Sequence, residues 1–115
     1  MADDLYERIA AASASHVAKD DRTTTLIFSC RVADFDHWLE GYEKAVAADS
    51  QMLAHRIWRS QDDSNKIVVA ETFPSRSYPQ EATADPATAE AMERDGIDMA
   101  SVQFDFYDEV SAWTR

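Results

Sequence analysis

The stretch TTTLIFSCRVADFDHWLEGYEKAVAAD, residues 23–49, decides the fold because its hydrophobic periodicity changes within it. Residues 23–32 alternate between two faces and are rich in β-branched and aromatic side chains, which predicts a strand. Asp34 is a helix N-cap candidate, and beyond it the apolar residues recur every three or four positions. This spacing predicts an amphipathic helix over 34–49, whose apolar stripe consists of Phe35, Trp38, Leu39, Tyr42, Ala45 and Val46. Gly41 lies mid-helix, where glycine costs about 1 kcal/mol relative to alanine, and we interpret it as tolerated.

The sequence C-terminal to this helix predicts three more strands and a second helical region. Residues 52–60 and 66–73 form a hairpin around the polar turn QDDSN, and residues 101–110 alternate as the last strand. Ser75 can cap the helical region between them, which Pro86 divides into two pieces and Gly96 ends. The order β-α-β-β-α-β predicts a ferredoxin-like α+β sandwich, with the helices on one face of an antiparallel sheet.

The N-terminal residues form a separate predicted unit. Residues 3–18 carry apolar side chains at helical spacing and acidic residues in their first turn, which predicts a leading helix. We therefore divide the chain into an N-terminal helical extension (1–22), the ferredoxin-like domain (23–110) and a C-terminal tail (111–115).

Composition and charge exclude several classes of function. The chain of 115 residues carries 22 acidic and 11 basic side chains, a net charge of −11, so binding to nucleic acids or anionic membranes is not expected. A hydrophobic fraction of 45% supports a folded core. No stretch is apolar enough to span a membrane, and the acidic first twenty residues do not resemble a signal peptide, so we expect a cytoplasmic protein.

The sheet face opposite the helices predicts self-association. It would display a mixture of apolar and polar side chains, including Ile27 and Tyr107. A mixed apolar face of this kind is rarely left in water, and packing against a second copy is the simplest way to cover it. We predict a homodimer.

Four segments resemble one superfamily: VADFDHW (32–38), HRIWRSQDDSNKIVVAETF (55–73), ADPATAEAMERDGI (84–97) and VQFDFYDEV (102–110). The chain is similar over roughly residues 23–110 to the dimeric α+β barrel superfamily, near the antibiotic-biosynthesis-monooxygenase-like small proteins. This resemblance implies two sheets packed face to face into a barrel. It also implies one of several activities, among them cofactor-free monooxygenases, polyketide cyclases, lactone isomerases and haem-degrading enzymes. The haem-degrading branch fits poorly, because residues 75–95 contain no histidine to hold iron.

The candidate catalytic residues are His55, Glu71, Tyr42 and Arg31. His55 lies within a predicted edge strand and can transfer protons near neutral pH, or it pairs structurally with a carboxylate. Glu71 interrupts an apolar strand, so its carboxyl either forms an ion pair with Arg31 or Arg59 or has a raised pKa. The Tyr42 hydroxyl, if buried, needs a hydrogen-bond partner and could bind a substrate phenol.

Aromatic residues from three predicted elements could wall a pocket for a flat aromatic or polyketide-like molecule, or they could simply fill the core. They are Phe28, Phe35, Trp38, Phe104 and Phe106. The spacing of histidine, cysteine and acidic residues suggests no metal site, and no motif suggests a cofactor. Two hypotheses follow: a cofactor-independent monooxygenase-like or cyclase-like enzyme, or a non-catalytic homodimeric binding or accessory protein.

Overall fold

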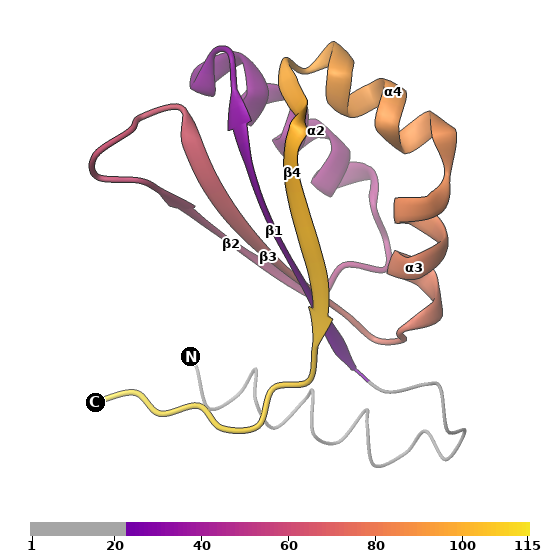
Figure 1. The fold of residues 1–115 in the computed structure, drawn as a ribbon. Coiled ribbons are helices and arrows are strands. Elements are labelled where there is room, and N and C mark those ends of the chain that lie inside the picture. Colours follow the sequence, from indigo (N-terminus) through magenta and orange to yellow (C-terminus); the bar gives the residue numbers. More distant parts are fainter. Residues whose placement is uncertain (1–22) are drawn as a thin grey trace.

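The computed structural model describes residues 23–115 as a four-stranded sheet covered on one side by three helices (Figure 1). The predicted helix over 3–18 lies outside the described residues. In chain order the elements are β1 (Thr24–Val32), α2 (Phe35–Ala48), β2 (Ala54–Arg59), β3 (Lys66–Phe73), α3 (Ser77–Ala84), α4 (Pro86–Arg94) and β4 (Ile97–Tyr107).

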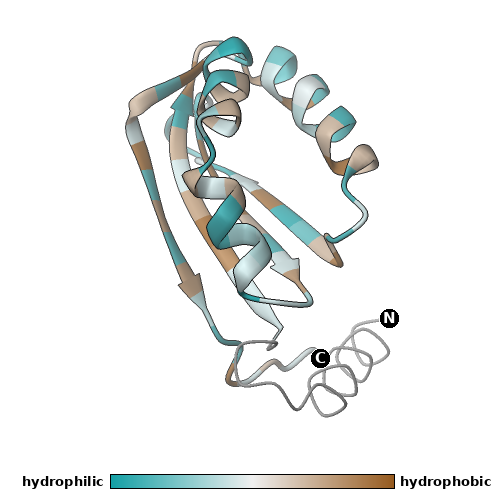
Figure 2. Cartoon of the chain, turned by 90° about the vertical axis from the view of Figure 1, so that its right-hand side faces the viewer, coloured by the Kyte–Doolittle hydropathy of each residue, from teal (hydrophilic) through white to brown (hydrophobic). Residues whose placement is uncertain are grey.

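The sheet has the strand order β2-β3-β1-β4, and every neighbouring pair is antiparallel. This is the predicted ferredoxin-like α+β arrangement, in which β2 and β4 form the edges. Figure 2 shows hydrophobic and hydrophilic bands alternating along the strands, as expected of a sheet with one buried face.

The predicted helix signals act mostly as expected. The Asp34 side chain accepts a hydrogen bond of 3.2 Å from the His37 backbone N–H and caps α2. Pro86 separates α3 from α4 and occupies the first turn of α4, which Asp85 caps. Gly96 follows α4 with a φ of +88°, a conformation that glycine adopts without strain. Ser75 does not cap α3, because the N-cap position is Arg76 and it makes no side-chain capping bond.

The last strand is longer at its start than predicted. β4 begins at Ile97 instead of residue 101, because the Gly96 turn places the chain directly beside the end of β1, where Ile97 lies opposite Val32. The strand ends at Tyr107. The register shifts between Ser29 and Arg31, and this irregularity interrupts the alternation of side chains that marks a strand in the sequence.

The core lies between the sheet and the helices. Trp38 on α2 packs with buried side chains of β1, β3 and β4, which are Cys30, Val32, Ile67, Val69 and Ile97. Burial raises the pKa of the Cys30 thiol to about 11, so Cys30 is a protonated core residue at neutral pH.

Gly41 is a close-contact position, which corrects the interpretation that it is merely tolerated. A Cβ atom built there would lie 2.7 Å from Oδ1 of Asp95 and 2.8 Å from Oδ2. Asp95 is the C-cap residue of α4, so the glycine lets the end of α4 approach α2. This contact joins the two parts of the helical layer.

Candidate functional site

A buried hydrogen bond between α2 and β3 forms the centre of the candidate site. The Tyr42 hydroxyl donates to Oε2 of Glu71 at 2.5 Å. Glu71 lies on the helix-facing side of β3, between the buried residues Val69 and Phe73, and is only 8% exposed. The sequence left two alternatives open for Glu71, an ion pair with Arg31 or Arg59 or a raised pKa. The structure gives Glu71 a neutral phenol as its partner and not an arginine.

The electrostatics of this pair favour the protonated forms of both groups. Burial raises the pKa of Glu71 above its ordinary value; the hydrogen bond from Tyr42 lowers it, and the negative charge of Asp49 raises it further. Burial and the Glu71 carboxyl raise the pKa of Tyr42 far above the ordinary range. A carboxyl group that holds its proton more tightly than usual can serve as a general acid or base closer to neutral pH.

His55 lies directly opposite Glu71 on the neighbouring strand β2. Its ring meets the Tyr42 ring edge-on, with the two centroids 5.5 Å apart. His55 is exposed while Glu71 is buried. The imidazole therefore lies between solvent and the Tyr42–Glu71 pair. The structure thus brings together three of the four predicted catalytic residues.

A second tyrosine–carboxylate bond, which the sequence did not reveal, borders the site. The Tyr78 hydroxyl of α3 donates to Oδ2 of Asp49, the C-cap residue of α2, at 3.0 Å. The Tyr78 ring packs against Phe73 with the centroids 5.4 Å apart. Both residues end or begin a helix, and their sequence separation of 29 positions gives no local signal of the contact.

The aromatic residues of α2 pack against the same site. Trp38 is 2% exposed and stacks on Tyr42 with centroids 5.1 Å apart, and Phe35 lies 5.8 Å from Trp38. The Arg59 guanidinium lies 4.0 Å above the Phe35 ring, which places this arginine in a cation–π contact. Trp38 therefore contacts Tyr42 directly, and Phe35 packs against Trp38.

The remaining predicted aromatic residues lie on β1 and β4, one and two strands away from β3. Phe28 on β1 pairs with Phe104 on β4, and Leu26 pairs with Phe106. The Phe104 and Phe106 rings meet edge-on at 6.0 Å, and Phe104 is 50% exposed. Leu26 also pairs with Glu71, so Glu71, Leu26 and Phe106 form one row across the helix-facing side of the sheet.

Arg31 lies apart from the other candidate catalytic residues. It alternates with the buried Cys30 and Val32 and therefore points to the opposite face of the sheet. Its guanidinium pairs with Asp63 in the loop between β2 and β3. Of the alternatives for Glu71, the ion pair with Arg31 is therefore not formed, and Arg31 lies outside the site.

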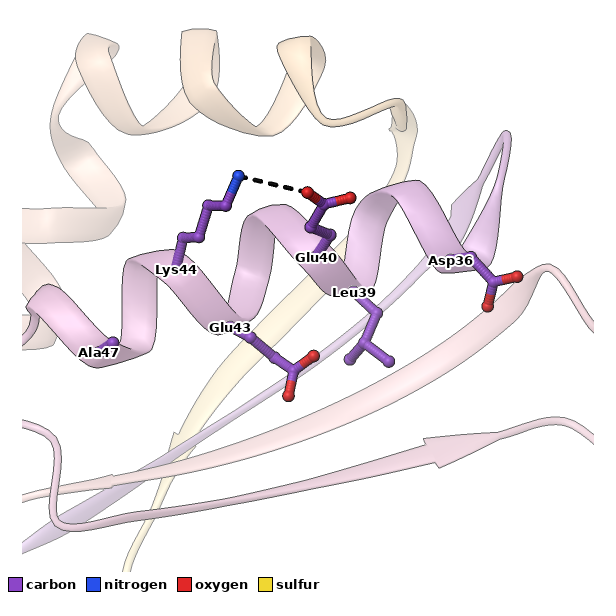
Figure 3. A pocket seen from close by; sticks show the side chains of 6 residues that line it. All are labelled: Asp36, Leu39, Glu40, Glu43, Lys44 and Ala47. Atoms are coloured by element: carbon purple, nitrogen blue, oxygen red, sulfur yellow. Dashed lines mark hydrogen bonds and ion pairs between the residues drawn. The ribbon is translucent and has the colours of Figure 1, made fainter.

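A shallow groove of about 450 Å³ runs along the outer surface of α2 (Figure 3). Glu43 and Leu39 project on one side of the helix, and the ion pair between Lys44 and Glu40 lies on the other. None of the predicted site residues lines this groove, whose walls are Asp36, Leu39, Glu40, Glu43, Lys44 and Ala47. It is an acidic, solvated helix surface separate from the Tyr42–Glu71 pair.

Two further observations concern residues 23–115 only. No group of three or more histidine, cysteine or acidic side chains in this part of the chain is arranged to hold a metal ion. No helix there combines the length and apolar character needed to cross a membrane.

The fold is similar to that of several solved structures. SnoaB, a cofactor-independent oxygenase from Streptomyces nogalater, matches 81% of this chain and 98% of its own, with a TM-score of 0.63 and 12% identity. A candidate antibiotic biosynthesis monooxygenase from Chloroflexus aurantiacus matches 80% of this chain and 97% of its own, with a TM-score of 0.60 and 15% identity. A hypothetical protein from Arabidopsis thaliana matches 87% of this chain and 99% of its own, with a TM-score of 0.59 and 19% identity.

No family model and no curated protein matches the sequence. The structural matches establish that the chain has the ferredoxin-like α+β fold of antibiotic-biosynthesis-monooxygenase-like proteins. At these sequence identities the matches show the fold of the chain but not its activity, because one fold supports many activities.

Proposed function

We propose that the protein is a cofactor-independent monooxygenase-like or cyclase-like enzyme that acts on an aromatic or polyketide-type small molecule. In its ionised form Glu71 accepts a proton from an acidic C–H or O–H group of the substrate and becomes the neutral acid, while Tyr42 and His55 orient that group. The resulting anion then reacts with dioxygen, in an oxygenase, or attacks a carbonyl of the same molecule, in a cyclase. The solved oxygenase of similar fold supports this class of chemistry.

The observation that carries the proposal is the 2.5 Å bond between Tyr42 and Glu71. A carboxyl that is 8% exposed in an apolar strand is costly unless it has a partner, and this one has a phenol in place of a cation. The raised pKa of Glu71 gives it the proton affinity that acid–base catalysis needs. A structural ion pair would have the opposite effect on that pKa.

The second aromatic group suggests the size of the substrate. Phe28, Phe104 and Phe106 lie on the helix-facing side of the sheet, and Phe106 is two strands from Glu71. Two strand spacings are about 10 Å. A molecule of several fused rings can contact both Phe106 and the acid, whereas a single phenol is too short to reach from one to the other.

The test compares wild type with Glu71→Gln and Tyr42→Phe on a panel of single-ring phenols and fused-ring polyketide-like phenols. Dioxygen uptake and product mass are measured with and without oxygen, and ligand affinity is measured by calorimetry. We expect turnover of fused-ring compounds by wild type, with loss of at least about 100-fold in Glu71→Gln, in line with the usual contribution of a general acid or base.

The matched control is Glu43→Gln, which removes the carboxyl of an exposed residue of α2 that is not part of the Tyr42–Glu71 pair. It should retain wild-type turnover. Equal activity of Glu71→Gln and wild type on a turned-over substrate would refute the catalytic role of Glu71.

The second candidate function is a non-catalytic binding or accessory protein. Within residues 23–115, every fully buried side-chain nitrogen or oxygen already has a hydrogen-bond partner, so the core satisfies itself without a ligand. If the protein binds fused-ring compounds in air but the mass of the compounds stays unchanged, the non-catalytic function is favoured over the enzymatic one.

In either case we propose that the protein acts as a homodimer. Among residues 23–115 no helix covers the mixed apolar face of the sheet, and this face supports the assembly.

A further inference from the structure

Asp49 is an acidic residue beside the Tyr42–Glu71 pair, and the proposed reaction gives it no role. It is the C-cap residue of α2 and follows Tyr42 by about two helical turns, so the two residues lie on the same side of the helix. Tyr42 reaches Glu71 from that side. Asp49 therefore lies on the side of α2 that faces β3, at the end of the helix.

Tyr78 of α3 fixes this carboxyl group close to Glu71. The Tyr78 hydroxyl donates to Oδ2 of Asp49 at 3.0 Å, and the Tyr78 ring packs against Phe73 with the centroids 5.4 Å apart. Phe73 follows Glu71 by two residues on β3, and both are buried on the helix-facing side of that strand. The anchor of Asp49 thus lies over the next residue of β3 on the face that carries Glu71.

The surroundings of Glu71 contain a second acid and no arginine or lysine. Each element packed against Glu71 contributes the residues that face it: Tyr42 and Asp49 of α2, Tyr78 of α3, His55 of β2 and Leu26 of β1. Among residues 23–115, neither Glu71 nor Asp49 takes part in an ion pair. The negative charge of Asp49 therefore acts on Glu71 without a cation to offset it, and it contributes to the raised pKa of Glu71.

The structural role of Asp49 does not require a charge. Besides its bond with Tyr78, Asp49 accepts a hydrogen bond of 2.8 Å at Oδ1 from the backbone N–H of Gln51, which turns the chain out of α2. An asparagine can make both contacts, because its amide oxygen accepts from Gln51 and its NH2 group donates to the Tyr78 oxygen. A carboxylate is also disfavoured at a helix C-terminus, and α2 has no basic residue in its last turn. The charge at this position thus brings the fold no evident benefit.

We propose that Asp49 is a positioning residue of the reaction that acts through Glu71: its carboxylate, fixed in place by Tyr78, makes Glu71 a stronger base toward the substrate. When ionised Glu71 accepts the substrate proton, the negative charge moves from Glu71 to the substrate. This transfer relieves the repulsion between the two carboxylates, so the charge of Asp49 favours it. The inference rests on the proposed role of Glu71.

The first test follows Glu71 without any substrate. The full chain is labelled with carbon-13, the carboxyl carbon of Glu71 is titrated by NMR, and the Glu71→Gln variant identifies its signal. We expect Asp49→Asn to move the midpoint of the Glu71 titration to lower pH, because a like charge is removed. Tyr78→Phe should move it in the same direction but less, because Asp49 keeps its charge and loses its anchor.

The matched control is Glu43→Gln, which removes one negative charge from an exposed residue of the same helix. It should leave the midpoint of Glu71 at its wild-type value. Urea unfolding of Asp49→Asn, which retains both hydrogen-bond contacts, checks that this variant is folded. A purely structural role of Asp49 would change stability and leave the midpoint in place.

The second test uses a compound that the wild type turns over. The pH profile of kcat/KM reports the ionisation of the free enzyme, so the limb that requires ionised Glu71 should move to lower pH in Asp49→Asn, in parallel with the NMR midpoint. The rate on the plateau should fall, because Glu71 is then a weaker base. Glu43→Gln should retain the wild-type profile.

The outcomes separate this inference from the proposed function. An unchanged Glu71 midpoint in folded Asp49→Asn, or an equal shift in Glu43→Gln, would overturn the role of Asp49 and leave that of Glu71 intact. If the midpoint shifts but Glu71→Gln turns over substrate as wild type does, the proposed function is wrong, and Asp49 has no role in the reaction. A shift confined to Asp49→Asn and Tyr78→Phe, matched by the rate profile, establishes Asp49 as a positioning residue.

Discussion

Two regions on the same side of the sheet, two strands apart, differ in which side chains they bury. On the β2 side, the polar groups Tyr42 and Glu71 are withdrawn from water and satisfy each other. On the β4 side, the rings of Phe104 and Phe106 meet edge-on, and half of Phe104 remains exposed. The first region buries polar groups that would normally contact water, and the second exposes an aromatic ring that would normally be buried.

This difference indicates that the first region contributes mainly to folding stability and the second mainly to ligand contact. Buried polar pairs are retained where their chemistry or their packing is required, because leaving one partner alone is costly. Exposed rings gain little for the fold, since contact with solvent forfeits much of the hydrophobic stabilisation. We therefore expect substitutions on the β2 side to affect folding strongly and substitutions on the β4 side to affect mainly ligand contact.

The largest contrast is between Trp38→Ala and Phe104→Ala. Trp38 is 2% exposed and stacks on Tyr42, so its removal should lower the free energy of unfolding by about 3–5 kcal/mol. Phe104 is half-exposed, and its removal should cost about 1 kcal/mol. Urea unfolding at equilibrium measures both values. Equal losses would remove the distinction between the regions.

Tyr42→Phe tests the polar pair itself. The substitution leaves the ring in place but removes the donor to a buried carboxyl, so we expect the free energy of unfolding to fall by about 1–3 kcal/mol. Tyr78→Phe is the matched control, because its acceptor Asp49 is only half-buried and water can replace the phenol. The control should lose clearly less in the same urea titration. A loss as large as that of Tyr42→Phe would mean that burial of the acceptor is not what matters.

The pH dependence of stability should separate the two regions as well. The pKa of Glu71 is raised in the folded state from an ordinary 4.5, so the folded protein binds more protons than the unfolded chain above that pH. The contribution of Glu71 to stability is thus fully present below about pH 4.5 and declines as pH rises through the folded-state pKa.

Glu71→Gln removes this contribution. The difference in unfolding free energy between wild type and Glu71→Gln should become less favourable to wild type from pH 4.5 upward. The corresponding difference for Phe104→Ala should stay flat, because no ionisable group is lost. A flat difference for Glu71→Gln would show that its pKa is not raised.

The sequence predicted those parts of the fold that depend on neighbours along the chain. Asp34, Pro86 and Gly96 each set a helix boundary through local backbone geometry, and the structure confirms all three. It did not predict the phenol partner of Glu71, because that bond joins residues 29 positions apart and depends on where α2 lies over the sheet. Arg31 has the same alternation as Ile27, so the strand pattern already placed it on the sheet face opposite the helices, where the structure has it.

Gly41 shows the same limit in a helix. Local propensity indicates a cost of about 1 kcal/mol for glycine, which Gly41→Ala should recover if the position were only tolerated. The structure instead places all three carboxyl atoms of Asp95 within 2.8 Å of the new Cβ. The backbone N–H of Asp95 is bonded to Ala91 and Glu93 of α4, so either the carboxyl rotates away from the new Cβ or the end of the helix shifts.

We therefore expect Gly41→Ala to lower the free energy of unfolding by about 1 kcal/mol, the lower end of the usual cost of overpacking. In an Asp95→Ala background the same change should be neutral or stabilising, because the clash is gone and the gain in helix propensity remains. This double-mutant cycle, measured by urea unfolding, isolates the contact that joins the helix over β2 to the helix that packs on β4. Stabilisation of the otherwise wild-type chain by Gly41→Ala would show that Asp95 moves away freely and that the two regions are not coupled through this contact.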